Sequence, residues 1–103
     1  MAMVAAVVLV LAGYVAASHH VRAAADLVAL SGAGQRTRGG DACRSAAGVA
    51  AANRVRIVSC RVQGDELDFV VTVTVAAQVS APSVLLPGEV TATAHAGRIG
   101  LLP

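Results

Sequence analysis

The first seventeen positions of the chain, MAMVAAVVLVLAGYVAA, form an apolar run without a charged residue. In a helix that rises about 1.5 Å per residue, this run covers roughly 26 Å, and it reaches about 30 Å when residues 18–20 are added. Such a length is at the short limit for crossing the hydrocarbon core of a bilayer. We therefore predict a transmembrane helix over residues 1–18.

Two other interpretations of the apolar run stay open. It could be a signal peptide that is cleaved at the small residues Val15, Ala16 and Ala17, or a helix buried in a protein core. A signal peptide normally has a basic segment before its apolar part, and no basic residue precedes this run. A core helix of this length needs a larger domain than the remaining residues provide. The transmembrane interpretation is therefore favoured.

The helical pattern continues beyond the apolar run. Small or branched apolar residues recur at helical spacing at Val21, Ala24, Ala25, Val28 and Ala29. Arg22 and Asp26 lie four positions apart on another face, where they can form an ion pair. We expect one helix to continue to about Ser31, with residues 19–33 as its juxtamembrane part.

A linker and a second helix are predicted next. Gly32 and Gly34 weaken a helix, and residues 34–40 (GQRTRGG) have the composition of a linker. Asp41 is a suitable N-cap for a short helix over residues 41–53. One face of that helix would contain small residues: Cys43, Ala46, Ala47 and Ala50.

Three strands are predicted in the remainder. Residues 54–62 alternate with Val58, Cys60 and Val62 on one side and with Val55 and Ile57 on the other. A turn at residues 63–65 places Gly64 where positive φ is favoured. A second strand over residues 66–75 directs apolar side chains to one face at Leu67, Phe69, Val71, Val73 and Val75. Residues 90–95 form a third strand, residues 80–88 form a loop with an apolar centre at 84–86, and residues 96–103 have no readable pattern.

Composition limits the domain that these elements can build. The chain has 103 residues with one Tyr, one Phe and no Trp, so a core must come from Val, Ala, Leu and Ile. Such a small core usually needs a covalent or external support. The predicted fold class is α+β, with a long N-terminal helix, a short second helix and an antiparallel sheet of about three strands. Residues 41–103 would form a small extracytoplasmic domain.

Cys43 and Cys60 are the two cysteines of the chain. If the apolar helix takes the domain out of the cytoplasm, a disulfide between them is the natural interpretation, and it requires their Cα atoms within about 7 Å. Two buried thiols are the alternative. A zinc site with two of the three histidines, His19, His20 and His95, lacks the spacing of known zinc motifs.

The charge pattern does not agree with the cysteines on orientation. Arg22, Arg36 and Arg38 follow the apolar run and no basic residue precedes it, so the positive-inside rule places the domain in the cytoplasm. The disulfide interpretation places it outside. Upstream basic residues beyond Met1 would remove this conflict.

Neither the charge nor the polar residues indicate an enzyme. The net charge of +2 and the scattered arginines, without aromatic neighbours, do not favour nucleic acid. Glu66 and Asp68 are best interpreted as a solvated strand edge, and no serine has the setting of a catalytic nucleophile. We therefore expect no catalytic residue, cofactor, metal or small-molecule substrate.

The segment RAAADLVALSGA at residues 22–33 resembles the juxtamembrane signature of TadE/TadG-like proteins of the Flp (tight-adherence) pilus system. The matching positions are Ala24, Ala25, Asp26, Ala29, Leu30, Gly32 and Ala33. The later segments ACRSAAGVAAANRVRIVSCRV, DFVVTVTV and ATAHAGRI are similar to the short actinobacterial branch, the helicase/secretion-neighbourhood TadE-like proteins. The resemblance covers nearly the whole chain.

This resemblance implies a pilin-like fold and a structural role in the cell membrane. The expected partners are other pilin-like subunits, pilus or secretion assembly proteins, and membrane lipid. Candidate packing residues are Gly13 and Ala17, which are small and four apart, and Arg22 with Asp26, which would set the register against a neighbouring helix. The alternative is a small secreted binding or effector-type protein released after signal-peptide cleavage. Family members usually have a basic stretch and a processing site before the apolar run, so we expect an upstream start or a processed form.

Overall fold

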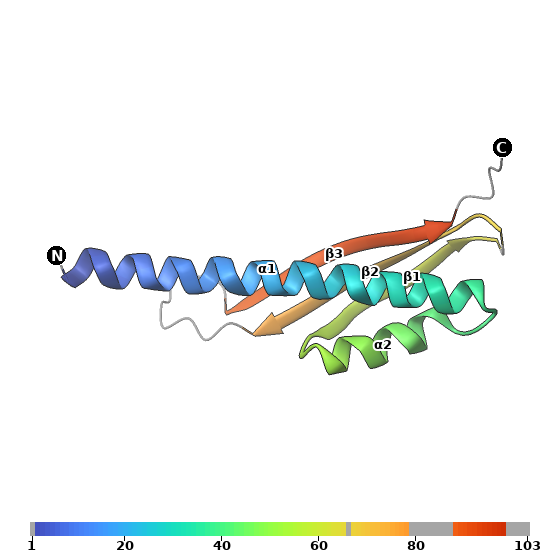
Figure 1. Cartoon of the computed structure of the whole chain (residues 1–103), viewed down its shortest axis with the longest axis horizontal. Helices are drawn as coiled ribbons and strands as arrows, with labels where there is room; N and C mark the ends of the chain where they lie inside the picture. The colour runs from blue at the N-terminus through green and yellow to red at the C-terminus, as the bar shows by residue number, and fades with distance from the viewer. Residues whose placement is uncertain (1, 66, 79–87, 99–103) are drawn as a thin grey trace.

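The protein is a two-layer α+β structure in which two helices cover one face of a three-stranded antiparallel sheet (Figure 1). This computed structural model describes residues 2–65, 67–78 and 88–98. The sheet has the strand order β1-β2-β3. The elements are α1 (Ala2–Thr37), α2 (Ala42–Ala52), β1 (Arg56–Gly64), β2 (Phe69–Gln78) and β3 (Glu89–Arg98). The predicted fold class is therefore confirmed.

The α1 helix is one continuous helix of 36 residues, and it is longer than the sequence pattern predicted. It includes residues 34–37, which were expected to belong to a linker. A Schellman-type cap ends it: the Gly39 N–H donates to the Arg36 carbonyl, the Gly40 N–H donates to the Gln35 carbonyl, and Gly39 has φ +81°. The stop signal is therefore the glycine pair at 39–40, whereas Gly32 and Gly34 are tolerated inside the helix.

The α2 helix begins as predicted, because the Asp41 side chain accepts a hydrogen bond of 3.1 Å from the Arg44 N–H. Its buried face consists of Ala42, Ala46 and Ala50, while Ala47 is exposed, in contrast to the predicted face. The helix ends at Ala52, and Arg54, just beyond its C-cap, is a left-handed residue at φ 60°. Since a left-handed residue cannot belong to a regular strand, β1 begins at Arg56 rather than at position 54.

Strand β2 lies at the centre of the sheet and supplies most of its core. Four alternating side chains point toward the helices and are buried: Phe69, Val71, Val73 and Val75. They pack on α1 residues of which the largest are Val21 and Val28. This core contains no buried polar or charged residue among the described positions.

Strand β1 contains a bulge that changes which side chains face the core. The register of β1 on β2 shifts between Ile57 and Ser59, and Val58 is 52% exposed. Beyond this point the alternation is offset by one residue. Ile57 therefore packs on the core together with Cys60, although strict alternation had placed them on opposite sides.

The turn between β1 and β2 uses Gly64 as predicted, at φ +105°. A Cβ atom there would lie 2.0 Å from the Asp68 carbonyl oxygen, so only glycine fits. Strand β2 begins at Phe69, and Leu67 is outside the strand and 62% exposed, in contrast to the prediction. Strand β3 extends through Arg98, beyond the predicted end at position 95. The predicted loop at 80–88 lies outside the described residues except for Gly88, and Glu66 also lies outside them.

Candidate functional site

The first half of α1 extends away from the folded domain (Figure 1). Its 18-residue apolar window has a mean hydropathy of 2.0 and no buried residue, so α1 is long and apolar enough to cross a membrane. Large apolar side chains are exposed on all sides of this half: Met3, Val4, Val7, Val8, Leu9, Leu11 and Val15. The apolar window of α1 is therefore not a core segment of this domain.

The second half of α1 has one buried face and one uncovered apolar face. The buried face consists of Val21, Ala24, Ala25, Val28, Ala29, Gly32 and Ala33. On the opposite face Leu27 is 51% exposed and Leu30 is 61% exposed, with the exposed Ala23 one turn before Leu27. Because Ala23, Leu27 and Leu30 are four and three residues apart, they form a single stripe.

The same side of the helix also has exposed apolar residues in the apolar half, and the exposed His19 and His20 separate them from Ala23. Leu9, Ala12 and Ala16 follow the same alternation of three and four residues and are all exposed. We call the six residues the outer stripe of α1: Leu9, Ala12, Ala16, Ala23, Leu27 and Leu30. Its members in the apolar half include small residues, which permit close contact between helices in lipid, while its later members include leucines, which favour association in water.

The four packing residues proposed from sequence do not form one surface. Gly13 and Arg22 are nine residues apart, which is two and a half helical turns, and the same separation holds for Ala17 and Asp26. The two pairs therefore point to opposite sides of α1. Arg22 and Asp26 are both exposed, and no ion pair joins their side chains in the described structure.

Sequence reasoning assigned neither Leu27 nor Leu30 to a packing surface, although Leu30 matches the family signature. Both residues lie within the amphipathic segment, but off the face that Val21 and Val28 define. Their position on the polar side of an amphipathic helix could have predicted an uncovered apolar face, because the domain that buries the opposite side does not contact them. The outer stripe is therefore a structural finding.

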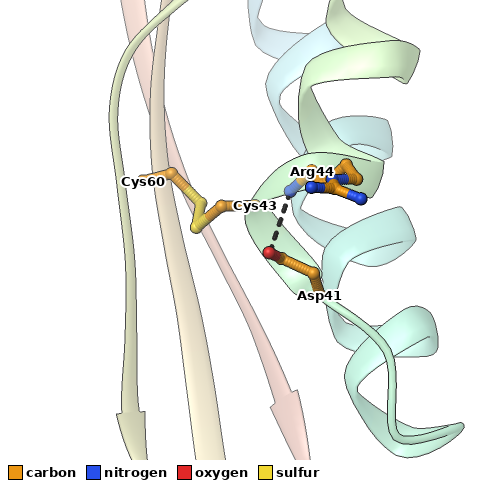
Figure 2. The surroundings of a disulfide bond; sticks show 4 residues. All are labelled: Asp41, Cys43, Arg44 and Cys60. Carbon is orange, nitrogen blue, oxygen red and sulfur yellow. Dashed lines mark hydrogen bonds between the residues drawn. A yellow bond between two sulfur atoms is a disulfide. The ribbon is translucent and has the colours of Figure 1, made fainter.

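The disulfide between Cys43 and Cys60 connects α2 to β1 (Figure 2). The Cα atoms lie 5.9 Å apart, within the predicted limit. Figure 2 also shows the Asp41 cap beside it, so the first turn of α2 is fixed both by the cap and by the covalent bond. Both sulfur atoms are used in this bond, which excludes the alternatives of free thiols and of a zinc site with cysteine ligands.

The remaining polar groups fall into small, separate contacts. On the sheet face away from the helices, the Thr72 hydroxyl is 2.9 Å from His95 Nδ1, and the Thr74 and Thr93 hydroxyls are 2.8 Å apart. At the end of α2, His20 Nε2 is 3.1 Å from the Asn53 carbonyl oxygen. Within the described ranges, no group of three or more His, Cys, Asp or Glu residues could hold a metal ion.

Among the titratable groups of the residues that the structure describes, Asp65 is the one whose pKa clearly departs from its ordinary value. Its carboxylate accepts hydrogen bonds of 2.8 Å from the Asp68 N–H and 2.9 Å from the Leu67 N–H, and these bonds lower the Asp65 pKa. They close the turn between β1 and β2. This role is structural, because the group caps its own turn.

Comparisons with known proteins found no matching family model, no matching curated protein and no matching solved structure.

Proposed function

We propose that the chain is a membrane-anchored minor pilin or pseudopilin-like subunit of a Flp/Tad-type pilus or secretion assembly. In this role the protein is a structural component and not an enzyme. The resemblance of residues 22–33 to the TadE/TadG-like signature supports the assignment to this class. The proposed residence is the cell membrane, with one span and the sheet domain outside the cytoplasm.

The outer stripe of α1 is the observation that carries the proposal. A helix that only anchors a domain needs no apolar residue on its solvent side above the membrane. Here Leu27 and Leu30 remain exposed on the same helix as an apolar segment in which the domain buries no residue. An assembly in which neighbouring subunits pack their long helices side by side would cover both parts of the stripe.

The disulfide supports an extracytoplasmic domain. Disulfides persist in oxidising compartments and are rare in the cytosol. The bond joins α2 to the edge strand β1, on which α2 packs. For a domain whose core is built from Ala and Val around one Phe, such a bond is a substantial share of its stability.

Photo-crosslinking in native membranes tests the proposal. The full chain is expressed with p-benzoyl-phenylalanine in place of Leu27, and a matched variant contains it in place of Arg61, which is exposed on β1. We expect crosslinks to other subunits from position 27 only, in a fraction that resists carbonate extraction. Absence of crosslinks from position 27, or equal crosslinking from both positions, would contradict side-by-side packing.

The same preparation tests the alternative of a secreted protein. Cleavage after Ala17 would give a mature chain that starts at Ser18, and its mass would identify it in the culture medium. Such a cleavage would remove Tyr14, which packs against the core from one turn below that site. A protein found intact in the membrane fraction supports the anchored form, whereas a released chain starting near Ser18 supports the alternative.

A further inference from the structure

A polar groove lies where the apolar half of α1 meets the folded domain. Tyr14, Ser18 and Arg22 line one side of it, and residues 89–92 of β3 line the other. The three α1 residues are four positions apart and therefore lie on one face of the helix. Figure 1 shows that the start of β3 reaches this part of α1. The folded domain thus begins directly at the end of the apolar segment.

The position of the groove corresponds to the headgroup layer of a membrane that α1 crosses. The apolar run ends at Ala17, and Arg22 follows five residues later, about 7.5 Å further along the helix axis. The hydrocarbon core of a bilayer is about 30 Å thick and the whole bilayer about 40–45 Å, so each headgroup layer occupies roughly 5–8 Å. Ser18 and Arg22 therefore span the depth at which lipid phosphates lie.

The groove contains donors that the protein does not use itself. Arg22 is exposed, and within the described residues it forms no ion pair, because Asp26 is not in contact with it and Glu89 pairs with Arg56. The hydroxyls of Tyr14 and Ser18 have no hydrogen-bond partner in the part of the chain that the structure describes. A guanidinium and two hydroxyls on one helix face match the oxygens of a phosphate group.

We propose that this groove binds the phosphate of a glycerophospholipid headgroup. The Arg22 guanidinium forms the ion pair with the phosphate, and the hydroxyls of Ser18 and Tyr14 donate hydrogen bonds to its oxygens. The Glu89 carboxylate at the far side is neutralised by Arg56, so it does not repel the phosphate. Binding would fix the height of the domain on the membrane. This inference rests on the membrane anchoring in the proposed function.

The test measures lipid retention by the full chain in maltoside micelles with native mass spectrometry. The added lipid is phosphatidylglycerol or, as a phosphate-free control, digalactosyldiacylglycerol. Tyr14 is the only tyrosine and the chain has no Trp, so its fluorescence reports on the groove in the same samples. We expect Arg22→Gln to weaken retention of phosphatidylglycerol about fivefold, the equivalent of roughly 1 kcal/mol for one arginine at a lipid surface.

The matched variant Arg61→Gln makes the same charge change on β1 and should retain phosphatidylglycerol like the unmodified chain. Equal retention of both lipids, or no effect of Arg22→Gln, would overturn the proposal. Displacement of the lipid by millimolar inorganic phosphate would assign the groove to a soluble anion and would also overturn it. Carbonate extraction distinguishes failure of the proposed function from failure of the lipid site. If carbonate extracts the chain from membranes, both are overturned. If the chain stays in the membrane and its lipid retention is insensitive to Arg22→Gln, only the lipid site is overturned.

Discussion

The two halves of α1 belong to one helix but differ in how apolar side chains are distributed around the helix axis. In residues 2–18 apolar side chains point in every direction and none is buried by the chain itself. In residues 19–37 the apolar positions separate into a buried face and the short exposed stripe at Leu27 and Leu30. A helix is amphipathic where its own domain buries one of its sides. The amphipathic pattern disappears in the first half, where only lipid or another protein can bury the apolar side chains.

The buried face of the second half also explains how the helix approaches the sheet. It is made mainly of Ala and Gly, and a Cβ atom on Gly32 would lie 3.2 Å from both the Ala42 carbonyl oxygen and Val71 Cγ1. Small residues therefore allow the α1 backbone to lie close to α2 and β2. In the first half, no atom of the described residues lies within 4 Å of the corresponding position at Gly13. The small size of Gly13 therefore serves no packing contact among the described residues.

A charge on the buried face should have the largest effect. Val28 has an exposed fraction of 0%, and its neighbour Leu27 is 51% exposed. Val28→Asp places an unpaired carboxylate in an apolar core, so we expect a loss of more than about 4 kcal/mol, which leaves the domain unfolded. Leu27→Asp should leave it folded, as seen by circular dichroism and disulfide formation. Similar unfolding of both variants would contradict the distinction between the two faces.

A charge in the first half should act on anchoring instead. Leu9 lies near the middle of the apolar run and is 72% exposed. Leu9→Arg should disfavour membrane insertion by roughly 3–4 kcal/mol, because an arginine at mid-bilayer replaces a leucine that favours insertion. Leu30→Arg, at a position 61% exposed in the second half, should insert normally. Carbonate extraction measures both, and equal extraction of the two variants would contradict a boundary between lipid and water within α1.

Loss of the disulfide should weaken the domain and leave the anchor intact. The bond joins residues that are 17 positions apart, and closing a loop of this size is worth about 3 kcal/mol in the chain-entropy model. The double variant Cys43→Ala, Cys60→Ala should lose that amount in urea unfolding in micelles while it still sediments with membranes. Reductant should destabilise the unmodified chain and not the double variant. A loss below about 1 kcal/mol would show that the Ala-rich core is sufficient alone.

The elements were predictable because each has a local cause. The Asp41 cap, the glycine turn at position 64 and the alternation in β2 are short-range signals, and all three are confirmed. The end of α1 was misplaced because Gly32 and Gly34 were interpreted as breakers. Their cost of about 1 kcal/mol each is compensated in this helix by packing, and for Gly32 by the close approach that a side chain would prevent.

Other features depend on tertiary context and had no local signal. The bulge near Val58 offsets β1 by one residue, so strict alternation assigned Ile57 and Cys60 to different faces. The candidate packing residues were chosen by spacing, and spacing cannot show which side of a helix its own domain covers. Only the position of the sheet shows that Arg22 faces a groove beside β3.

The two glycines of α1 provide a finer comparison of its halves. Gly32→Ala should destabilise the domain by about 1 kcal/mol, because the buried neighbours of Gly32 have no room to move and the strain exceeds the gain in helix propensity. Gly13→Ala should not change unfolding of the domain, since no atom of the described residues lies within 4 Å of the new methyl group. It should instead reduce crosslinking between subunits if this side packs in lipid. Urea unfolding measures the effect on domain stability, and the crosslinking yield measures the effect on subunit packing. Destabilisation of the domain by Gly13→Ala would contradict the inference that the first half of α1 does not contribute to domain packing.

The smallest effect is expected at the end of the domain farthest from the apolar half, in the turn after β1 (Figure 1). Backbone hydrogen bonds from Asp68 and Leu67 lower the pKa of Asp65 below its ordinary value of 3.8. A lowered pKa in the folded state means that the charged form stabilises the fold. This contribution is complete above the unfolded pKa and is lost as the pH falls below about 4 through the folded pKa. Asp65→Asn lacks this titration while the other carboxyl groups remain, so its stability should decrease less than that of the unmodified chain between pH 5 and pH 2.5 in micelles. Parallel pH profiles of the two proteins would show that the turn does not depend on the charge of Asp65.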